Sequence, residues 1–187
     1  MKEIEILIEV QDSKEKALEV LSKFEDKGIK KTLDVYFCDP LRSELKPDEK
    51  GRLENCFRIR QKEGDSLVAY KIDHFNDGKW SYSDEYETKV GDFTMMSKIV
   101  EQLGLKELIR IDNKKYTFTT EEYEIVLEDV VDLGLFMEVE KLEQVSDDKV
   151  LETKEEIRAF LKSLDIEFGE EQTDGKPELM LRKKSSV

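Results

Sequence analysis

Pairs of glutamates separated by one residue occur on three stretches that alternate like β-strands. They are Glu3 with Glu5, Glu85 with Glu87, and Glu138 with Glu140. Because successive side chains of a strand point to opposite faces of a sheet, both members of a pair lie on one face. Carboxylates grouped in this way suit hard divalent cations such as Mg²⁺ or Mn²⁺.

Cations occur at the same spacing on a further strand-like stretch, FRIRQK. It places Arg58, Arg60 and Lys62 on one face, and the stretch VAYKI adds Lys71. Arg and Lys suit phosphate oxygens, Arg through its planar fork. The carboxylates and cations together suit a metal–polyphosphate ligand if the sheet curls its charged faces inward. An inward charged face is costly unless its charges are paired or bind a ligand. On spacing alone, a solvent-exposed charged face is an equal alternative.

Eight stretches are predicted to be the strands that position these side chains. They cover residues 2–10, 32–39, 55–63, 67–75, 82–90, 108–118, 123–131 and 136–142. Most alternate apolar and polar residues, and turn-like sequences such as KEGDS and FNDGK separate neighbours. Successive hairpins predict a largely antiparallel sheet with helices at its margins.

Three helices are predicted, each from an apolar stripe and a capping residue. The stretch 12–28 has Asp12 and Ser13 as cap residues and ends at Gly28. The stretch 92–104 begins with Asp92 as its cap. The stretch 153–165 begins with a capping box of Thr153 and Glu156. The stripes are expected to pack against the sheet rather than to bind a cofactor.

Length and charge restrict the class of protein. The 187 residues predict one domain over 1–187, with a mobile loop at 41–56 and a tail at 182–187. The net charge of −14 argues against a nucleic-acid or membrane partner. Without a signal-like N-terminus or a long apolar run, the chain is expected to be cytoplasmic.

Residues that commonly bind metals or act as bases are few outside the charged strands. Cys38 and Cys56 lack the spacing of a metal knuckle and are expected to be free thiols. His74, the one histidine of the chain, lies in the turn-like stretch DHFNDGKW and is expected in a loop. Mechanisms that need a histidine base are therefore disfavoured.

The order of several motifs resembles the CYTH superfamily, also called triphosphate tunnel metalloenzymes. EIEIL is similar to a Glu-x-Glu-x-Lys signature, DVYFCDP to an Asp-x-Tyr-Phe-x-x-Pro strand, and FRIR with AYK to paired cationic strands. EYE fits the middle acidic strand. LEDVVDLGLFMEVE is similar to a Leu-Asp-x-Val…Leu-Gly-x-Phe-x-Glu-x-Glu segment. Each motif is weak alone, but their joint order and spacing are specific.

The resemblance implies an α+β fold in which an eight-stranded antiparallel β-barrel encloses a tunnel. It implies metal ions held by Glu3, Glu5, Glu138 and Glu140, with Glu128 as a further ligand. It implies a triphosphate bound by Arg58, Arg60, Lys71 and Lys115. Glu85 and Glu87 match the remaining acidic pair, which would orient the cations or assist with metal. In hydrolysis, a metal-held or Lys71-activated water would attack a phosphorus.

The chain departs from the family pattern in four motifs, at five positions. Leu7 stands where the signature has lysine, and Ser83 stands where an arginine often precedes the acidic pair. Asn113 and Lys115 stand at a common Lys-x-Arg, and Glu128 replaces an aspartate. Because each charge-assisted hydrogen bond is worth about 1.5–3 kcal/mol, these losses would weaken triphosphate binding. The candidates to compensate are Arg110, Lys114 and Lys62.

Three hypotheses about function follow. The first is an enzyme: a class IV adenylyl-cyclase-like protein that converts ATP to cyclic AMP and pyrophosphate, or a triphosphatase acting on ATP, tripolyphosphate or thiamine triphosphate. The second is a triphosphate-binding module weakened in catalysis by Leu7, Ser83 and Asn113. The third is a structural domain with solvated charged strands. The resemblance alone suggests a homodimer.

Overall fold

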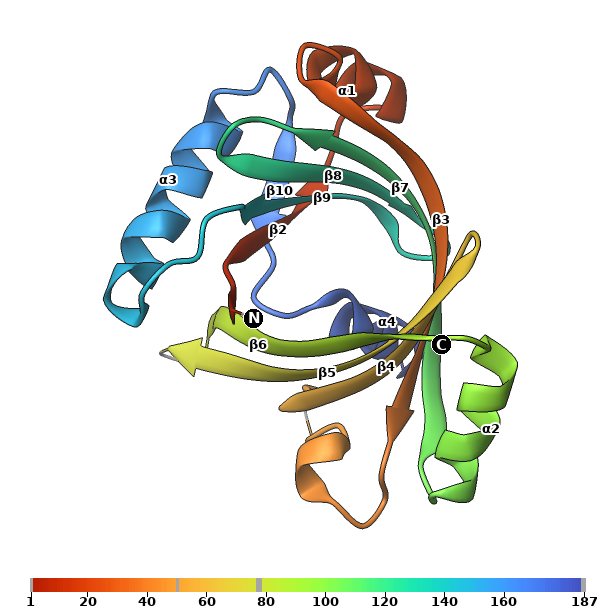
Figure 1. Ribbon diagram of the computed structural model, residues 1–187. Helices are drawn as coiled ribbons and strands as arrows, with labels where there is room; N and C mark the ends of the chain where they lie inside the picture. The colour runs from red at the N-terminus through yellow and green to blue at the C-terminus, as the bar shows by residue number, and fades with distance from the viewer. Residues whose placement is uncertain (1, 50, 77–78, 186–187) are drawn as a thin grey trace.

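Ten antiparallel strands form a single sheet that curls on itself (Figure 1). The computed structural model describes residues 2–49, 51–76 and 79–185. The strands lie in the order β1-β6-β5-β4-β3-β7-β8-β9-β2-β10. Their bounds are β1 Lys2–Glu3, β2 Glu5–Val10, β3 Glu25–Cys38, β4 Asn55–Lys62, β5 Asp65–Asn76, β6 Lys79–Val90, β7 Lys106–Thr119, β8 Tyr123–Val130, β9 Gly134–Lys141 and β10 Phe168–Glu171.

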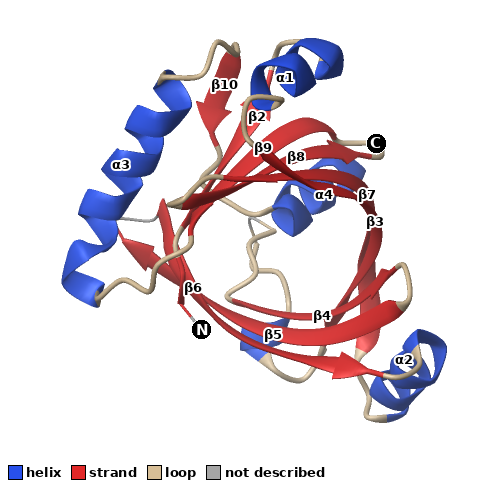
Figure 2. Cartoon of the chain, turned by 45° about the horizontal axis from the view of Figure 1, so that its top comes forward, coloured by secondary structure: helices blue, strands red, loops and turns tan. Residues whose placement is uncertain are grey.

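Ile4 joins the two sides of the curl. β1 pairs with β6 at one edge of the sheet, whereas β2 pairs with β9 near the other edge. Because only Ile4 separates β1 from β2, the two edges must lie beside one another, and Figure 2 shows the strands arranged as a ring. The predicted antiparallel barrel is confirmed in kind. Its strand number differs, because the first predicted strand is divided at Ile4 and β10 was not predicted.

Four α-helices and two short 3-10 helices complete the described chain. They are α1 Lys14–Leu21, α2 Phe93–Gln102, α3 Val150–Lys162, α4 Lys176–Ser185, η1 Ser43–Leu45 and η2 Asp147–Lys149. The predicted caps of α1 and α2 are confirmed: Ser13 accepts a hydrogen bond from the Lys16 amide, and Asp92 accepts one from the Met95 amide.

Two predicted helix boundaries are wrong. α1 ends at Leu21 rather than Gly28, because the chain from Glu25 onward pairs with β7 as part of β3. α3 begins at Val150, so Thr153 lies inside the helix and is buried there instead of capping it.

Other local predictions have mixed outcomes. His74 lies in strand β5 rather than in a loop, with its ring stacked on Tyr82 at 4.4 Å. Both cysteines are free thiols, as predicted. Of the predicted tail, residues 182–185 form the end of α4, and residues 186–187 lie outside the described part of the chain.

The helices are divided between the two faces of the sheet. α1 and α3 cover the outer face of β2, β8 and β9, where Ile6, Ile125 and Ile157 belong to one buried cluster. α2 packs on the outer face of β3 and β4 through Val100 and Ile59. α4 differs, because its Met180 joins a cluster inside the curl with Leu7. The outer face of the sheet is therefore apolar where the helices cover it. The inner face carries charged side chains as well as the apolar cluster beside α4.

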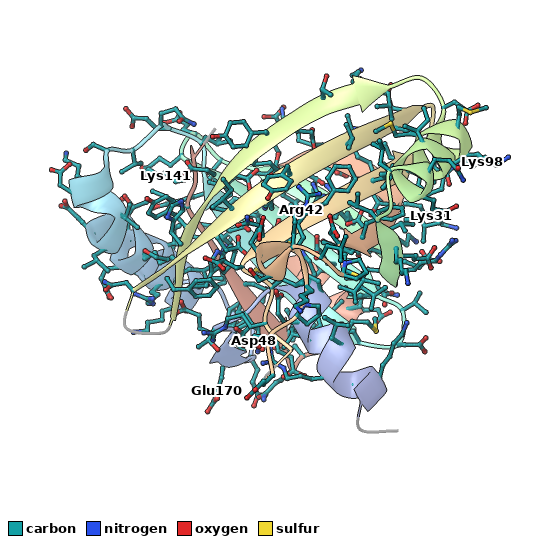
Figure 3. The ribbon with its side chains drawn as sticks, turned by 90° about the horizontal axis from the view of Figure 1, so that it is seen from below. Lys31, Arg42, Asp48, Lys98, Lys141 and Glu170 are labelled. Atoms are coloured by element: carbon teal, nitrogen blue, oxygen red, sulfur yellow. The ribbon has the colours of Figure 1, made fainter. Side chains whose placement is uncertain are left out.

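Charged side chains that point away from the curl surround the molecule (Figure 3). Lys31 of β3 and Lys98 of α2 lie at its periphery and are exposed. The neighbours of Lys31 in the chain, Lys30 and Thr32, line the interior instead. The strand alternation thus separates an outer charged surface from an inner one.

Candidate functional site

A charged cavity of about 310 Å³ lies inside the curled sheet. Its acidic lining comes from Glu3, Glu5, Asp73, Glu85, Glu87, Glu124, Glu138, Glu140 and Glu178. Its basic lining comes from Lys30, Arg58, Arg60, Lys62, Lys71, Lys115 and Lys176. The strands that carry the charged pairs therefore direct them inward, and the cavity has the lining of a site for an ionic ligand.

Ten of the twelve residues predicted for the site line this cavity. The two exceptions are Glu128 and Arg110. Glu128 is fully buried behind the lining, where its carboxylate is bound by lysines. Arg110 is wrong as a candidate, because it is exposed on the outer face of β7 and paired with Glu107. Lys115 lies five residues further along β7 and therefore has the opposite orientation.

Arg60 is held by a two-pronged ion pair with Asp34. Its Nε donates to Asp34 Oδ1 at 2.6 Å and its Nη2 donates to Oδ2 at 2.7 Å. The two residues are directly opposite on β3 and β4. Although burial opposes ionisation, the guanidinium of Arg60 holds the pKa of Asp34 well below its usual range. Asp34 thus fixes the direction of the guanidinium across the cavity wall.

Arg58 and Lys71 are each shared by carboxylates. Arg58 Nη2 lies 2.9 Å from Glu85 Oε1 and 3.5 Å from Glu87 Oε2. Lys71 Nζ lies 2.6 Å from Glu3 Oε2 and 3.4 Å from Glu85 Oε2. Glu85 therefore connects the two cations. Against the effect of burial, a hydrogen bond with Glu3 and the charges of Lys71 and Arg58 lower the pKa of Glu85 to about 2. The supporting role of Glu85 stays a prediction.

The glutamates of β1, β2 and β9 carry more negative charge than their neighbours compensate. Burial raises the pKa of Glu3 to about 7 despite the attraction of Lys71. Burial, together with repulsion from Glu3 and Glu138, raises the pKa of Glu140 to about 8. The pKa of Glu5 is also raised well above its ordinary value, by burial and by Glu138. A cluster of this kind has the charge and the ligand type for a divalent cation.

Lys176, at the first position of α4, is one of the site residues that the sequence patterns did not reveal. Its Nζ donates to Glu138 Oε2 at 2.6 Å and also to Glu128. Glu128 is bound on its other oxygen by Lys115 at 2.5 Å. Although burial disfavours its ionised form, the pKa of Glu138 is held well below its usual value by Lys176 and Lys115. The one sequence signal is a helix start of the form Asp-Gly-Lys-Pro at residue 174.

The positions that depart from the family pattern have clear places. Leu7 is 2% exposed, lines the cavity and lies opposite Glu138 in the sheet. Ser83 is buried, and its hydroxyl donates a hydrogen bond to Asp73 Oδ1 at 2.6 Å. It therefore supplies no positive charge where other family members have an arginine. Asn113 is 1% exposed, and its Oδ1 has no hydrogen-bond partner within the described residues.

A comparison of sequences identifies the family. The profile of the CYTH domain matches residues 1–172. The chain belongs to the CYTH domain family. A Methanocaldococcus jannaschii protein named "Putative adenylate cyclase" is 37% identical over 175 residues, which cover 89% of this chain and 91% of the relative. The family match ends before residue 176, so Lys176 lies outside the part that the CYTH profile describes.

Solved structures share the CYTH fold of this chain. A Pyrococcus horikoshii protein superposes with a TM-score of 0.80 at 23% identity, covering 97% of this chain and 99% of the other. A Vibrio parahaemolyticus "putative adenylate cyclase" superposes with a TM-score of 0.77 at 14% identity, covering 96% of this chain and 97% of the other. A Hippeastrum protein whose structure is described by a dominant triphosphatase activity superposes with a TM-score of 0.66 at 15% identity. The match covers 99% of this chain and 95% of the other.

No helix among the described residues of this CYTH protein combines the length and apolar character needed to span a membrane.

Proposed function

We propose that this CYTH protein is a metal-dependent enzyme that acts on a triphosphate inside its charged cavity. The observation that carries the proposal is that cations and carboxylates from different strands converge on that cavity. Arg58, Arg60 and Lys71 come from adjacent strands β4 and β5, whereas Glu5, Glu138 and Glu140 come from β2 and β9 across the curl. An anion with a bound cation is the ligand that complements both walls.

The carboxylates of Glu3, Glu5, Glu138 and Glu140 would hold Mg²⁺ or Mn²⁺. Their raised pKa values, described above for three of them, support this assignment because metal binding would relieve their repulsion. A divalent ion there would neutralise charge on the phosphate groups. Glu128 has two lysine partners and no exposed surface, so we assign it to positioning Lys115 and Lys176.

The cationic residues would bind and orient the triphosphate. Arg58 and Arg60 present guanidinium groups whose directions are fixed by Glu85 and Asp34. Lys71 of β5, whose ammonium contacts Glu3 of β1 and Glu85 of β6, would neutralise charge on the phosphate group under attack. Because phosphoryl transfer requires little covalent participation by the protein, such positioning accounts for most of the catalysis.

Lys176 would replace the lysine that is missing at Leu7. Leu7 lies opposite Glu138 in the sheet, and the Lys176 ammonium binds that same carboxylate. The family's cation would therefore arrive from α4 instead of from β2. This arrangement would keep the positive charge of the cavity while Leu7 packs against Met180 in the inner apolar cluster.

The reaction that we favour is cyclisation of ATP, with triphosphate hydrolysis as the alternative. The relative at 37% identity bears an adenylate cyclase name, which supports cyclisation. The Hippeastrum structure is described by triphosphatase activity, which supports the alternative. In cyclisation, the ribose 3′-hydroxyl attacks the α-phosphorus, a new oxygen–phosphorus bond forms, and pyrophosphate leaves.

Product analysis would test the proposal. The protein would be incubated with ATP, thiamine triphosphate or tripolyphosphate and with Mg²⁺ or Mn²⁺. Cyclic AMP with pyrophosphate indicates a cyclase, and orthophosphate with diphosphate indicates a triphosphatase. The Arg58→Gln variant serves as the control, since it removes a central cation. Turnover no greater than that of Arg58→Gln with every substrate would contradict an enzymatic function and leave binding alone.

A further inference from the structure

Three metal-binding side chains converge at the part of the cavity that α4 covers. They are Cys56 of β4, Asp73 of β5 and Glu178 of α4, and their ligand atoms all lie within 4.8 Å of one another. Cys56 is 6% exposed and Glu178 is 3% exposed, and Asp73 is half-buried. All three line the cavity. This group is separate from the glutamates of β1, β2 and β9.

Cys56 also belongs to the inner apolar cluster that contains Leu7 and Met180. Among the described residues it has no hydrogen-bond partner, and it faces the two carboxylates. Within the same part of the chain, no ion pair includes Cys56, Asp73 or Glu178. Burial and the adjacent acidic groups raise the pKa of Cys56 well above its usual value and that of Glu178 to about 7. Three acidic groups thus share a buried space in which Lys71 acts on Cys56 and Asp73 from a distance but, among the described residues, forms an ion pair with neither.

One oxygen of each carboxylate accepts a hydrogen bond from the protein. Ser83 Oγ donates to Asp73 Oδ1 at 2.6 Å, and Trp80 Nε1 in turn donates to Ser83 Oγ at 3.0 Å. The Leu53 amide donates to Glu178 Oε1 at 3.2 Å. Hydrogen bonds of this kind fix the carboxylates that bind metals in proteins. Ser83, at a position where the family often has arginine, thus orients Asp73 through its hydroxyl.

We propose that Cys56, Asp73 and Glu178 form a second metal site, selective for a borderline-soft divalent ion of the Zn²⁺ or Co²⁺ type. A thiolate with two carboxylates favours such ions over Mg²⁺, which prefers oxygen ligands alone. Three protein ligands leave a fourth position that opens into the cavity, where water or a ligand oxygen binds. The thiol and any protonated carboxyl release their protons to solvent when the ion binds.

The site connects α4 to the sheet. Glu178 lies two residues after Lys176 on α4, while Cys56 and Asp73 belong to β4 and β5. An ion bound to all three fastens the start of α4 over the cavity and with it the Lys176 ammonium. The site would therefore stabilise the position of α4 in the absence of substrate.

Cobalt spectroscopy tests the site on the complete, reduced, metal-free chain. Co²⁺ is titrated in without substrate but with excess Mg²⁺, which occupies the oxygen-only glutamate site. The expected result is a thiolate-to-cobalt charge-transfer band that saturates at one Co²⁺ per chain. Cys56→Ser removes the band, and Glu178→Gln weakens Co²⁺ binding at least tenfold. Cys38→Ser is the matched control, because Cys38 lies half-buried on β3 outside the cluster, and it keeps the band.

Absence of the band in the wild-type protein, or its persistence in Cys56→Ser, would overturn the proposal. Should Cys56→Ser not fold, X-ray absorption of the zinc-loaded Cys38→Ser protein decides, since Cys56 is then its one remaining cysteine. One sulfur ligand at about 2.3 Å supports the site. A shell of oxygen and nitrogen alone refutes it. Neither readout depends on catalytic activity, so the test is independent of the proposed reaction.

Discussion

At the scale of single residues, five of the seven cations that line the cavity, namely Arg58, Arg60, Lys71, Lys115 and Lys176, are already paired with carboxylates. Arg60 with Asp34 and Lys71 with Glu3 show the pattern, with separations of 2.6 Å in both pairs. Breaking such a buried pair by removing one partner is costly, because the other charge stays desolvated. The pairs therefore keep each cation in a defined direction, and a phosphate can join the pair without reorganising the wall.

Arg60→Lys is predicted to weaken tripolyphosphate binding by about tenfold or more, since Lys cannot reproduce the two-pronged contact. Arg110→Lys is the matched control. Arg110 makes the same fork with Glu107, at 2.7 and 2.6 Å, but on the exposed outer face. The Arg110→Lys substitution should change the free energy of unfolding by less than about 0.5 kcal/mol and leave tripolyphosphate binding intact. Calorimetric titration measures both effects, and equal losses for the two variants would contradict a special role of Arg60.

The stability of the metal-free protein is predicted to fall as pH rises from about 5 to 8. Burial and neighbouring glutamates raise the pKa of Glu140 from 4.5 to about 8, so the folded chain keeps a proton that the unfolded chain releases in this range. The slope approaches about 1.4 kcal/mol per pH unit for each such carboxyl. Denaturant unfolding in the presence of a chelator measures it.

Glu140→Gln should reduce this slope, because the amide has no proton to release. Glu152→Gln, at an exposed position of α3, should leave the slope unchanged. A slope that is the same in Glu140→Gln and the wild-type protein would show that other groups cause the pH dependence.

At the scale of elements, α4 packs into the interior of the curled sheet, whereas the other α-helices lie on its outer face. Asp174, just before it, is bound by both Arg52 and Arg182, at 2.9 and 2.8 Å. Lys176 reaches the buried carboxylates, and Met180 packs in the inner cluster with Leu7. These contacts connect the end of the chain to β2, β8 and β9. The helix is therefore part of the wall of the site.

Lys176→Met is predicted to destabilise the fold by about 3–5 kcal/mol, because Glu128 and Glu138 lose their shared partner while Lys115 alone remains near. Lys184→Met, on the exposed last turn of the same helix, should have little effect. Adding Glu128→Gln to Lys176→Met should recover part of the stability without recovering tripolyphosphate binding. Recovery of both would mean that Lys176 only compensates buried charge.

The elements that the sequence predicted are those with strong local patterns. The alternation of 55–63 and 82–90 predicted β4 and β6 and the grouping of their charges on one face, but it left open whether that face points inward. The same alternation could have excluded Arg110, since Lys115 on that strand faces the opposite way. The first half of β3 is polar and exposed, and it is a strand only because β7 pairs with it. Lys176 contacts residues 48 and 38 positions away, and no local pattern contains such a contact.

At the scale of the whole molecule, the protein must attract an anion despite a net charge of −14. The cavity resolves this conflict because seven cationic side chains converge on its lining. The surplus of carboxylates lies partly on the glutamate wall and partly on the exposed outer surface. A divalent cation is needed to offset the glutamate wall, so binding of triphosphate and of metal should be mutually dependent.

This dependence predicts the thermal behaviour of the protein. Tripolyphosphate together with Mg²⁺ should stabilise the fold by about 2.7 kcal/mol at a ligand concentration a hundred times Kd, whereas either one alone should do much less. Scanning calorimetry measures the four conditions. Glu138→Gln should lose the effect of Mg²⁺, and Glu152→Gln on the exposed face of α3 should retain it.

Stabilisation by tripolyphosphate alone would mean that the cations bind it without metal and that the glutamate wall has another purpose. Stabilisation under none of the conditions would mean that the pairs inside the curl, such as Lys71 with Glu3, are too strong for a triphosphate to enter.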